Sequence, residues 1–261
     1  MIDFLEEYQL KKPIIFDSHA HYDDKKFDGI RDELLDDLPR HGVCGVINCG
    51  CDTESSKKAL EFAEKYSYIY AAVGVHPENI GGGTVSEIEA LSRHKKCVAI
   101  GEIGLDYYWV SDNKEKQKAI FEEQLILANR INLPVIVHDR EAHADTLELL
   151  KKHRPKGVVH SFSGSCEMAR EILNIGMYIG IGGVITFKNA RKLPEVVEML
   201  PEDRLLLETD APYLTPVPYR GETNHSAMIF FTAKKIAEIR NTTVEQVLTS
   251  ARKNTEKLFK I

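Results

Sequence analysis

The sequence lacks the features that mark several classes of protein. It has only 17 Gly and 10 Pro in 261 residues, which excludes collagen-like and low-complexity chains. No apolar run approaches the roughly 18 residues of a membrane-spanning helix, and Glu6 and Glu7 lie where a signal peptide carries positive charge. Lys and Arg number 34 against 40 Asp and Glu, so the net charge of −6 excludes a basic nucleic-acid coat. We therefore expect a cytoplasmic protein with no membrane partner.

Cysteine is also scarce, and its pattern argues against disulfides. The five cysteines are an odd number without a Cys-x-x-Cys pair: Cys44, Cys49, Cys51, Cys97 and Cys166. A chain of this length can bury enough apolar surface to fold without covalent links. Cys49-Gly50-Cys51 could be half of a metal site, but no second sulfur pair or nearby histidine completes it. We expect the cysteines to be small buried apolar residues.

What is present is a regular alternation of short β-rich runs and longer amphipathic stretches. Eight runs are predicted to be strands: Ile14–Phe16, Val43–Ile47, Ile69–Val75, Val98–Ile100, Val135–Val137, Gly157–Val159, Tyr178–Ile181 and Leu205–Leu207. Apolar residues at helical spacing predict helices, among them 54–66, 115–131 and 244–259. Strands alternating with helices pair in parallel, and eight such units in about 250 residues are typical of an α/β fold, the closed (β/α)8 TIM barrel.

No linker or change of composition divides the chain, so we expect a single domain over residues 1–261. An open doubly wound sheet is the alternative fold, but it usually carries a Gly-rich phosphate turn after an early strand. Gly81-Gly82-Gly83 instead precedes Thr84, which suits the N-cap of a helix, and we interpret the triplet as a loop. The N-terminal extension, Met1 to Lys12, is expected to cover the bottom of the barrel.

Polar side chains follow five of the predicted strands with a regularity that packing does not explain. His19 and His21 follow the first strand, and their two-residue spacing places them on one face. The fourth, fifth, sixth and eighth strands are followed by Glu102, His138, His160 and Asp210. Because barrel strands converge at their carboxyl ends, these six side chains are expected to lie together. They exceed the needs of one four-coordinate ion, so the sequence predicts two divalent cations with a shared ligand.

Each of these residues alone has a simpler explanation. His138 or His160 could be a hydrogen-bonded core histidine, and Asp210 could cap the turn that follows it. Six such coincidences at five strand ends are a poor explanation, because a buried unpaired charge costs several kcal/mol and a bound cation relieves that cost. The remaining helix-region histidines have charged neighbours and are interpreted as surface residues: His41, His94 and His153.

Five motifs occur along the chain: Asp17-Ser18-His19-Ala20-His21, Gly74-Val75-His76-Pro77, Gly101 to Tyr107, His160 to Gly164, and Glu208 to Tyr213. Together they resemble the TatD family of metal-dependent deoxyribonucleases, and residues 254–259 are similar to the family's closing helix. The resemblance covers the whole chain. It implies a two-metal barrel hydrolase that cleaves phosphodiesters of DNA, often as a 3′ to 5′ exonuclease, with Mg, Mn, Zn or Co as the metal. Single strands or ends are the expected DNA partner, and a monomer the expected state.

The resemblance also implies roles for individual residues. Glu102 bridges the two ions, with His19, His21 and Asp210 on one and His138 and His160 on the other. Asp210 holds and deprotonates the attacking water, so it and Glu102 are the expected catalytic residues. Glu208, two residues earlier, either orients a ligand or forms a salt bridge inside the barrel.

Substrate binding requires groups beyond the metal ligands. Arg140, two residues after His138, is the best-placed cation for a phosphate. Tyr107, with Tyr108 and Trp109, could stack an unpaired base or form a packed loop. His76, in the second motif, is expected to contact substrate through the resemblance.

Two positions differ from the family pattern. Glu78 replaces the second histidine of His-Pro-His, and Ser226 replaces a proline after Asn224. The first change could redirect nucleic-acid binding, and the second could reshape the loop. Neither touches an expected metal ligand.

Two other functions fit the same sequence features. One is metal-dependent hydrolysis of an amide, lactone or aminoacyl-tRNA ester on the same scaffold. Relatives of that kind often bridge the metals with a carboxylated lysine, where this chain has Glu102. The other is a catalytically silent metal-binding protein, which would be expected to have lost Glu102 or Asp210, and both are present.

Overall fold

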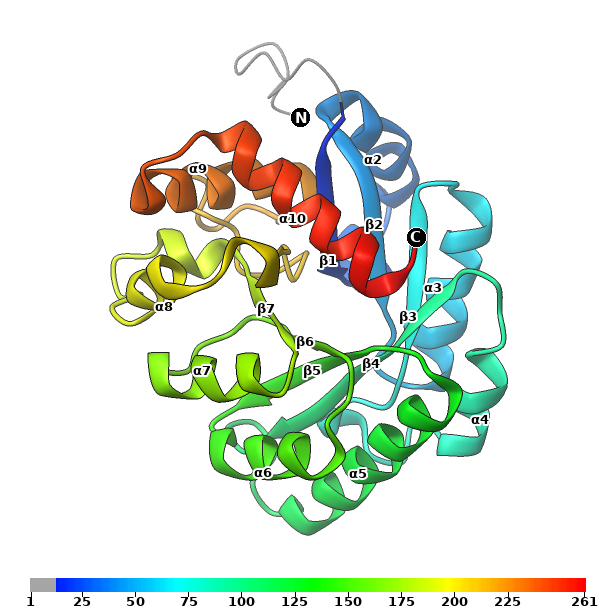
Figure 1. Cartoon of the computed structure of the whole chain (residues 1–261). Helices are drawn as coiled ribbons and strands as arrows, with labels where there is room; N and C mark the ends of the chain where they lie inside the picture. The colour runs from blue at the N-terminus through cyan, green and yellow to red at the C-terminus, as the bar shows by residue number, and fades with distance from the viewer. Residues whose placement is uncertain (1–12) are drawn as a thin grey trace.

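Eight parallel strands form the barrel in this computed structural model, which describes residues 13–261 (Figure 1). Neighbours in the sequence are neighbours in the sheet, in the order β1 to β8. A parallel bridge between Ala20 and Ala211 joins the last strand region to the first. The strands are β1 (Ile15–Ala20), β2 (Val43–Cys49), β3 (Ile69–Val73), β4 (Cys97–Asp106), β5 (Val135–Arg140), β6 (Gly157–Val159), β7 (Tyr178–Ile181) and β8 (Leu205–Leu207). The predicted barrel is confirmed.

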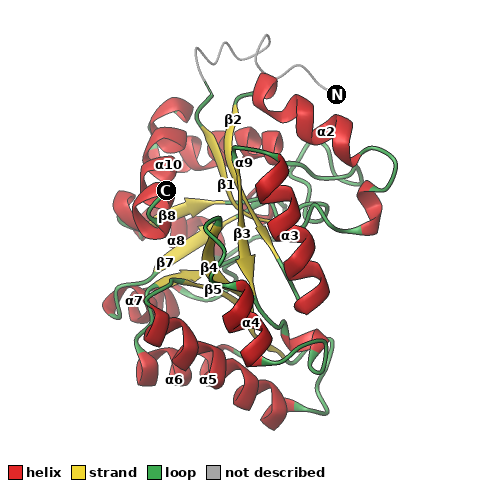
Figure 2. Ribbon diagram, turned by 90° about the vertical axis from the view of Figure 1, so that its right-hand side faces the viewer, coloured by secondary structure: helices red, strands yellow, loops and turns green. Residues whose placement is uncertain are grey.

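Helices surround the strands on the outside, as the side view shows (Figure 2). The α-helices are α2 (Arg31–Asp37), α3 (Thr53–Lys65), α4 (Val85–Leu91), α5 (Lys114–Ile131), α6 (His143–His153), α7 (Cys166–Asn174), α8 (Leu193–Met199), α9 (Ile229–Arg240) and α10 (Val244–Phe259). The predicted cap is confirmed: the Thr84 hydroxyl accepts a hydrogen bond from the Glu87 N–H, and the Glu87 carboxylate accepts one from the Thr84 N–H. The predicted helix 244–259 agrees with α10 at both ends.

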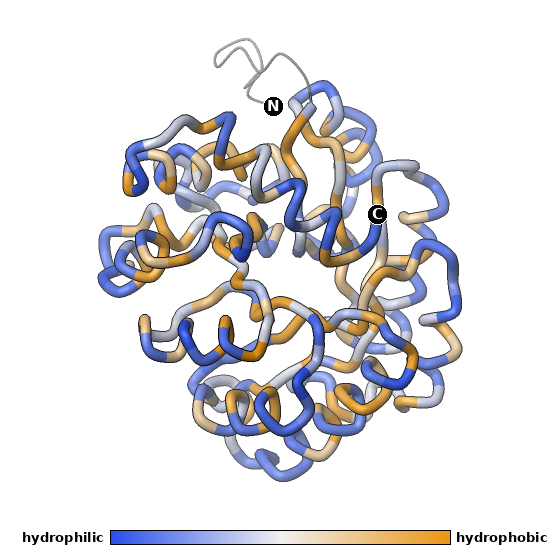
Figure 3. The backbone as a smooth tube through the Cα atoms, viewed as in Figure 1, coloured by the Kyte–Doolittle hydropathy of each residue, from blue (hydrophilic) through white to orange (hydrophobic). Residues whose placement is uncertain are grey.

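The barrel interior is filled by side chains from all eight strands. They form one apolar cluster with Leu258 and Phe259 from α10: Phe16, Ile47, Ala72, Val98, Ile136, Val158, Tyr178 and Leu206. A larger cluster joins the strands to the surrounding helices, and the hydropathy colouring shows apolar strand segments inside a more polar helical layer (Figure 3). Helix α10 therefore closes the start of the barrel. The extension expected to do so, residues 1–12, lies outside the described part of the chain.

Several strands run further than the sequence predicts. The first strand continues through His19 to Ala20, the fourth through Glu102 to Asp106, and the fifth through His138 to Arg140. Charged side chains normally end a predicted strand, but here parallel pairing continues, for example between Gly104 and His138. The polar side chains are thus held by the sheet itself, which is more rigid than a loop. Among residues 13–261, no helix is long and apolar enough to cross a membrane.

Candidate metal centre

The structure brings all six predicted metal ligands together where the strands end. His19 lies on β1 with His21 one residue beyond it, Glu102 lies on β4 and His138 on β5, and His160 and Asp210 follow β6 and β8. Ligand atoms from this set lie within 4.8 Å of one another in groups of three. Residues almost 200 positions apart thus meet because the barrel brings all carboxyl ends to one mouth.

The Glu102 carboxylate lies at the centre of the cluster, and its two oxygens face different histidines. Oε2 lies 3.3 Å from the Nε2 of His19 and 3.2 Å from the Nε2 of His21. Oε1 lies 2.9 Å from the Nδ1 of His138 and 2.7 Å from the Nε2 of His160. The side chain is only 4% exposed. This arrangement suits a carboxylate that contacts two cations at once.

Asp210 approaches the cluster from the open side. Its Oδ1 lies 3.5 Å from the Nε2 atoms of both His19 and His21, and its side chain is 22% exposed. The backbone there is left-handed, with φ of 59°, and the Asp210 N–H donates to the carbonyl oxygen of His19. Asp210 is therefore the carboxylate of the cluster that solvent can reach.

Hydrogen bonds on the far side of the rings leave lone pairs pointing into the cluster. His21 donates from Nδ1 to the Cys49 carbonyl oxygen at 2.9 Å, and the Nδ1 of His19 lies 3.4 Å from the Cys49 sulfur. The Nε2 atoms of these two rings then face each other at 2.9 Å. Two lone pairs at that separation repel unless a cation lies between them and the carboxylates. The donor set therefore fits a divalent metal.

His138 on β5 is oriented in the same way, with a carboxylate as its hydrogen-bond partner. The Nε2 of His138 donates to Asp106 Oδ2 at 3.0 Å, which directs Nδ1 toward Glu102 and His160. Burial opposes protonation of His138, but Asp106 and Glu102 outweigh it and raise its pKa to about 9. For Glu102, burial acts to raise the pKa, yet the surrounding imidazoles hold it well below its usual value. The cluster therefore attracts positive charge, a proton or a metal ion.

Glu208 lies behind His160 and is 1% exposed. Its carboxylate accepts a short hydrogen bond from the Ser161 N–H, and Oε1 lies 3.9 Å from the Nδ1 of His160. Burial raises the pKa of Glu208 to about 8. Of the two roles considered for it, the orienting one agrees better with this geometry, because Glu208 fixes the backbone next to His160.

The expected substrate-binding residues lie in three different settings. His76 joins the cluster, with its Nε2 3.4 Å from Glu102 Oε1. The hydroxyl of Tyr107 donates to Asp145 and its ring packs against the core, so it does not reach the cluster. Arg140 is exposed and lies over the ring of Tyr108, at 4.3 Å from its centroid.

The aromatic residues after β4 divide between the two explanations considered for them. Tyr107 belongs to the packed loop, whereas Tyr108 and Trp109 are 56% and 61% exposed. Arg140 also lies 5.2 Å from the Trp109 ring centroid. This group forms an exposed cationic and aromatic surface beside the mouth.

Three sequence interpretations need correction or extension. Cys49 and Cys51 do have nearby histidines, because the Nδ1 atoms of His19 and His21 lie 3.4 and 3.7 Å from the two sulfurs. All five cysteines are free, as predicted, but only Cys49 and Cys97 are buried, whereas Cys44, Cys51 and Cys166 are half-buried. His41 is not a surface residue: it is 7% exposed and bonded to Asp37.

Asp106 is the functional partner that sequence reasoning missed. It belongs to the third motif, four residues after Glu102, but only the parallel pairing of β4 with β5 reveals that it contacts His138. A carboxylate at a strand end without an assigned ligand role was the available signal.

The serine that replaces the family proline ties the last loop to the first strand. The Ser226 hydroxyl donates to Asp17 Oδ2 at 2.7 Å, and its backbone N–H donates to the Tyr22 hydroxyl at 2.9 Å. A proline has no N–H and could not make the second bond. The replacement therefore provides its own contacts in a fully buried position.

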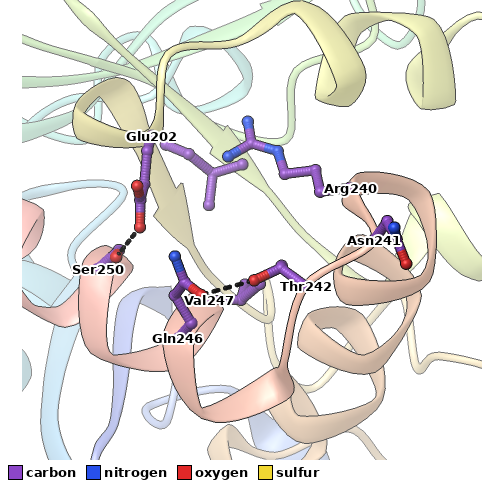
Figure 4. A pocket seen from close by; sticks show the side chains of 8 residues that line it. Glu202, Arg240, Asn241, Thr242, Gln246, Val247 and Ser250 are labelled. Atoms are coloured by element: carbon purple, nitrogen blue, oxygen red, sulfur yellow. Dashed lines mark hydrogen bonds between the residues drawn. The ribbon is translucent and has the colours of Figure 1, made fainter.

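A pocket of about 330 Å³ lies at the other end of the barrel, between the start of β8 and the junction of α9 with α10 (Figure 4). Its polar side chains pair with each other: Ser250 with Glu202, and Thr242 with Gln246. No histidine among residues 13–261 lines it. It is therefore not a candidate metal site.

A parallel eight-stranded barrel with histidines and carboxylates at its mouth defines a class, the metal-dependent hydrolases of TIM-barrel fold. Within that class, residues 16–260 match the model of the family described as TatD related DNase, and the chain belongs to this TatD family. It is 40% identical to YabD of Bacillus subtilis, an uncharacterized metal-dependent hydrolase, over 95% of this chain and 100% of the relative.

Other relatives agree with this assignment. YcfH of Escherichia coli, also an uncharacterized metal-dependent hydrolase, is 34% identical over 95% of this chain and 96% of its own. The crystal structure of the TatD homologue YjjV from Escherichia coli superimposes with a TM-score of 0.88 at 34% identity. That match covers 95% of this chain and 99% of YjjV. The protein is thus a TatD-family metal-dependent hydrolase.

Proposed function

We propose that this protein hydrolyses phosphodiester bonds of DNA, using two divalent metal ions, and that it acts on single strands or ends as a 3′ to 5′ exonuclease. The observation that carries the proposal is the Glu102 carboxylate, whose Oε2 faces His19 and His21 while Oε1 faces His138 and His160. The description of the matching family as DNases supports the choice of DNA.

The contacts of Glu102 support a division of the donors between two ions. His19, His21 and Asp210 would hold one, and His138 and His160 the other, with Glu102 shared. Mg, Mn, Zn and Co are all compatible with imidazole and carboxylate donors to different degrees. When bound, such ions activate water, polarise the phosphoryl group and neutralise the leaving oxygen.

The protein's own side chains would position the reactants. Burial alone would raise the pKa of Asp210, but His19 and His21 lower it strongly, so Asp210 is a carboxylate at neutral pH. It can therefore accept a hydrogen bond from the attacking water and orient it. Arg140 is exposed at the rim, where it lies over the Tyr108 ring, and it can attract a phosphate of the incoming strand.

The recessed position of the cluster favours ends over intact duplex. Glu102 and His160 are almost fully buried, with exposures of 3% and 4%. An intact duplex is too wide to bring its scissile phosphate to such a depth, and a net charge of −6 provides little compensation for opening it. A frayed or single-stranded end meets no such barrier.

The test is a metal-supplemented digestion of end-labelled DNA. Single strands labelled at either end, blunt duplex and covalently closed circles are incubated with Mg²⁺, Mn²⁺, Co²⁺ or Zn²⁺, with an aminoacyl-tRNA deacylation assay in parallel. We expect stepwise shortening from the 3′ end and slow attack on circles. His94→Asn is a matched control, since His94 lies on another part of the fold, where it pairs with the exposed Glu64.

Three results would contradict the proposal. They are equal rates on circles and on single-stranded ends, absence of nuclease activity with all four metals, and efficient deacylation without nuclease activity. The last result would indicate that the protein hydrolyses aminoacyl-tRNA esters on the same scaffold.

A further inference from the structure

His76 differs from His21 and His138 in the group that contacts its far nitrogen. Behind His21 and His138 the far nitrogen faces an acceptor, the Cys49 carbonyl oxygen and the Asp106 carboxylate. Behind His76 it faces a donor, because the backbone N–H of Glu78 points at Nδ1 from 3.2 Å. The His21 and His138 rings therefore keep a proton on the far nitrogen, and His76 cannot.

The local backbone fixes this contact. His76 is the N-cap of a short 3-10 helix (Pro77–Asn79), with extended dihedrals of φ −70° and ψ 147°. Pro77 begins this helix, where its missing N–H is no loss, so Glu78 supplies the first free N–H. The His76 N–H donates to the Cys51 carbonyl oxygen at 2.9 Å, which anchors the residue to the end of β2.

With Nδ1 occupied as an acceptor, a neutral His76 carries its proton on Nε2. That atom points into the metal centre, 3.4 Å from Glu102 Oε1. The ring lies edge-on to His138, with centroids 4.5 Å apart, and His76 is 7% exposed. A protonated nitrogen has no lone pair for a metal. Distance alone groups His76 with Glu102 and His138 as a ligand set, but its hydrogen bonding argues against that role.

We propose that His76 is a catalytic hydrogen-bond donor and not a metal ligand. Its Nε2–H would donate to a non-bridging phosphoryl oxygen of the substrate, where negative charge grows as the bond is hydrolysed. A preorganised donor in a buried site costs no reorganisation when charge develops, and loss of one such donor typically slows turnover by about 10² to 10³. This inference rests on the proposed phosphodiester hydrolysis.

Two substitutions separate the donor from the helix cap. His76→Asn places an oxygen near the Nδ1 position, so it can still accept from the Glu78 N–H, but no donor reaches the Nε2 position. His76→Gln places its amide nitrogen near the Nε2 position. We expect His76→Asn to bind both metals with unchanged affinity in chelator competition, and to lose about 10² to 10³ in kcat on single-stranded DNA. His76→Gln should recover at least tenfold over His76→Asn.

A second readout does not depend on activity. In ¹⁵N-histidine NMR spectra of the Mg²⁺-loaded or Zn²⁺-loaded protein, His76 should show a protonated Nε2 and a lone pair on Nδ1, whereas His21 should show a protonated Nδ1. This pattern would support the donor even if the wild-type protein proved inactive on DNA, in which case only the substrate assignment would fail. A metal-bound Nε2 on His76, or weaker metal binding by His76→Asn, would overturn the proposal.

Discussion

At the scale of single residues, Asp210 carries a negative charge that the fold does not require. Its left-handed backbone, with φ of 59°, is one that Asn adopts as readily as Asp. Asp210→Asn should therefore fold normally, retain at least one metal, and lose about 10² to 10⁴ in turnover, the usual span for a general base. Metal analysis and single-turnover kinetics check this together. Near-normal turnover at saturating metal from pH 6 to 9 would exclude Asp210 from the reaction.

Glu208 provides a test of electrostatics in the metal-free protein. Its pKa rises from 4.5 to about 8 on folding because it is buried. A raised carboxyl pKa stabilises the folded state fully below pH 4.5, and this contribution is lost as the pH rises toward 8. In Glu208→Gln the amide oxygen can still accept a hydrogen bond from the Ser161 N–H, but the side chain no longer titrates. The variant should therefore not lose this stability as the pH rises.

Denaturant unfolding at pH 5 and pH 8 measures the effect. Between these two values, the free energy of unfolding of the wild type should fall relative to Glu208→Gln by roughly 3 to 4 kcal/mol. Parallel pH profiles for the two proteins would show that Glu208 does not titrate in this range.

At the scale of elements, the pairing of β4 with β5 lets Asp106 control His138. Asp106→Asn keeps an oxygen for the N–H groups of Tyr108 and Trp109 but loses the charge that holds the His138 Nε2–H. Because such partners orient the metal ligand, we expect metal affinity or activity to fall by about 10- to 100-fold.

Chelator competition against the wild type gives the size of this loss. The matched control is Asp145→Asn, since Asp145 contacts Tyr107 and Lys118 on the outer side of this region. If both variants bind metal equally well, Asp106 is a packing residue and not a positioning one.

The boundaries of the strands and helices show how much of the fold could be predicted from the sequence. The strands 157–159, 178–181 and 205–207 and the helix 244–259 agree with prediction at both ends, because apolar periodicity and turn residues mark them clearly. The first, fourth and fifth strands are longer than predicted, because a metal site places polar side chains where sequence patterns indicate a strand end. Local sequence signals cannot show that a strand continues through buried charges.

In the candidate site, too, some residues could be predicted from the sequence and others could not. The six ligand-type residues could be predicted because barrel topology alone brings strand ends together. Asp106 and the two cysteines behind His19 and His21 could not, since their roles depend on which ring nitrogen they face. The difference between His76 and the other rings is likewise a matter of one backbone N–H.

At the scale of the whole molecule, metal binding should contribute directly to stability. Ions held by the cluster at the barrel mouth would bind only the folded chain, and each would contribute about 2.7 kcal/mol at 100 times its Kd. For a chain of this length the corresponding rise in Tm is roughly 5 to 10 °C per ion. The gain should increase from pH 6 to 9, because metal competes with the proton on His138, whose pKa is about 9.

Differential scanning calorimetry with EDTA and with added metal measures this gain. Glu102→Gln should lose most of it, while His94→Asn should keep all of it. Equal Tm values with and without metal would mean that the cluster does not hold ions in the folded state.

The central claim is that Glu102 joins two metal ions in the barrel mouth. Anomalous scattering from crystals of the Mn²⁺- or Zn²⁺-loaded protein, recorded on both sides of the metal absorption edge, tests it most directly. The account predicts two peaks about 3.5 to 4 Å apart, one beside the Nε2 atoms of His19 and His21, the other beside the Nδ1 of His138 and the Nε2 of His160. A single peak on one side of Glu102, or no peak near it under metal-replete conditions, would contradict the account.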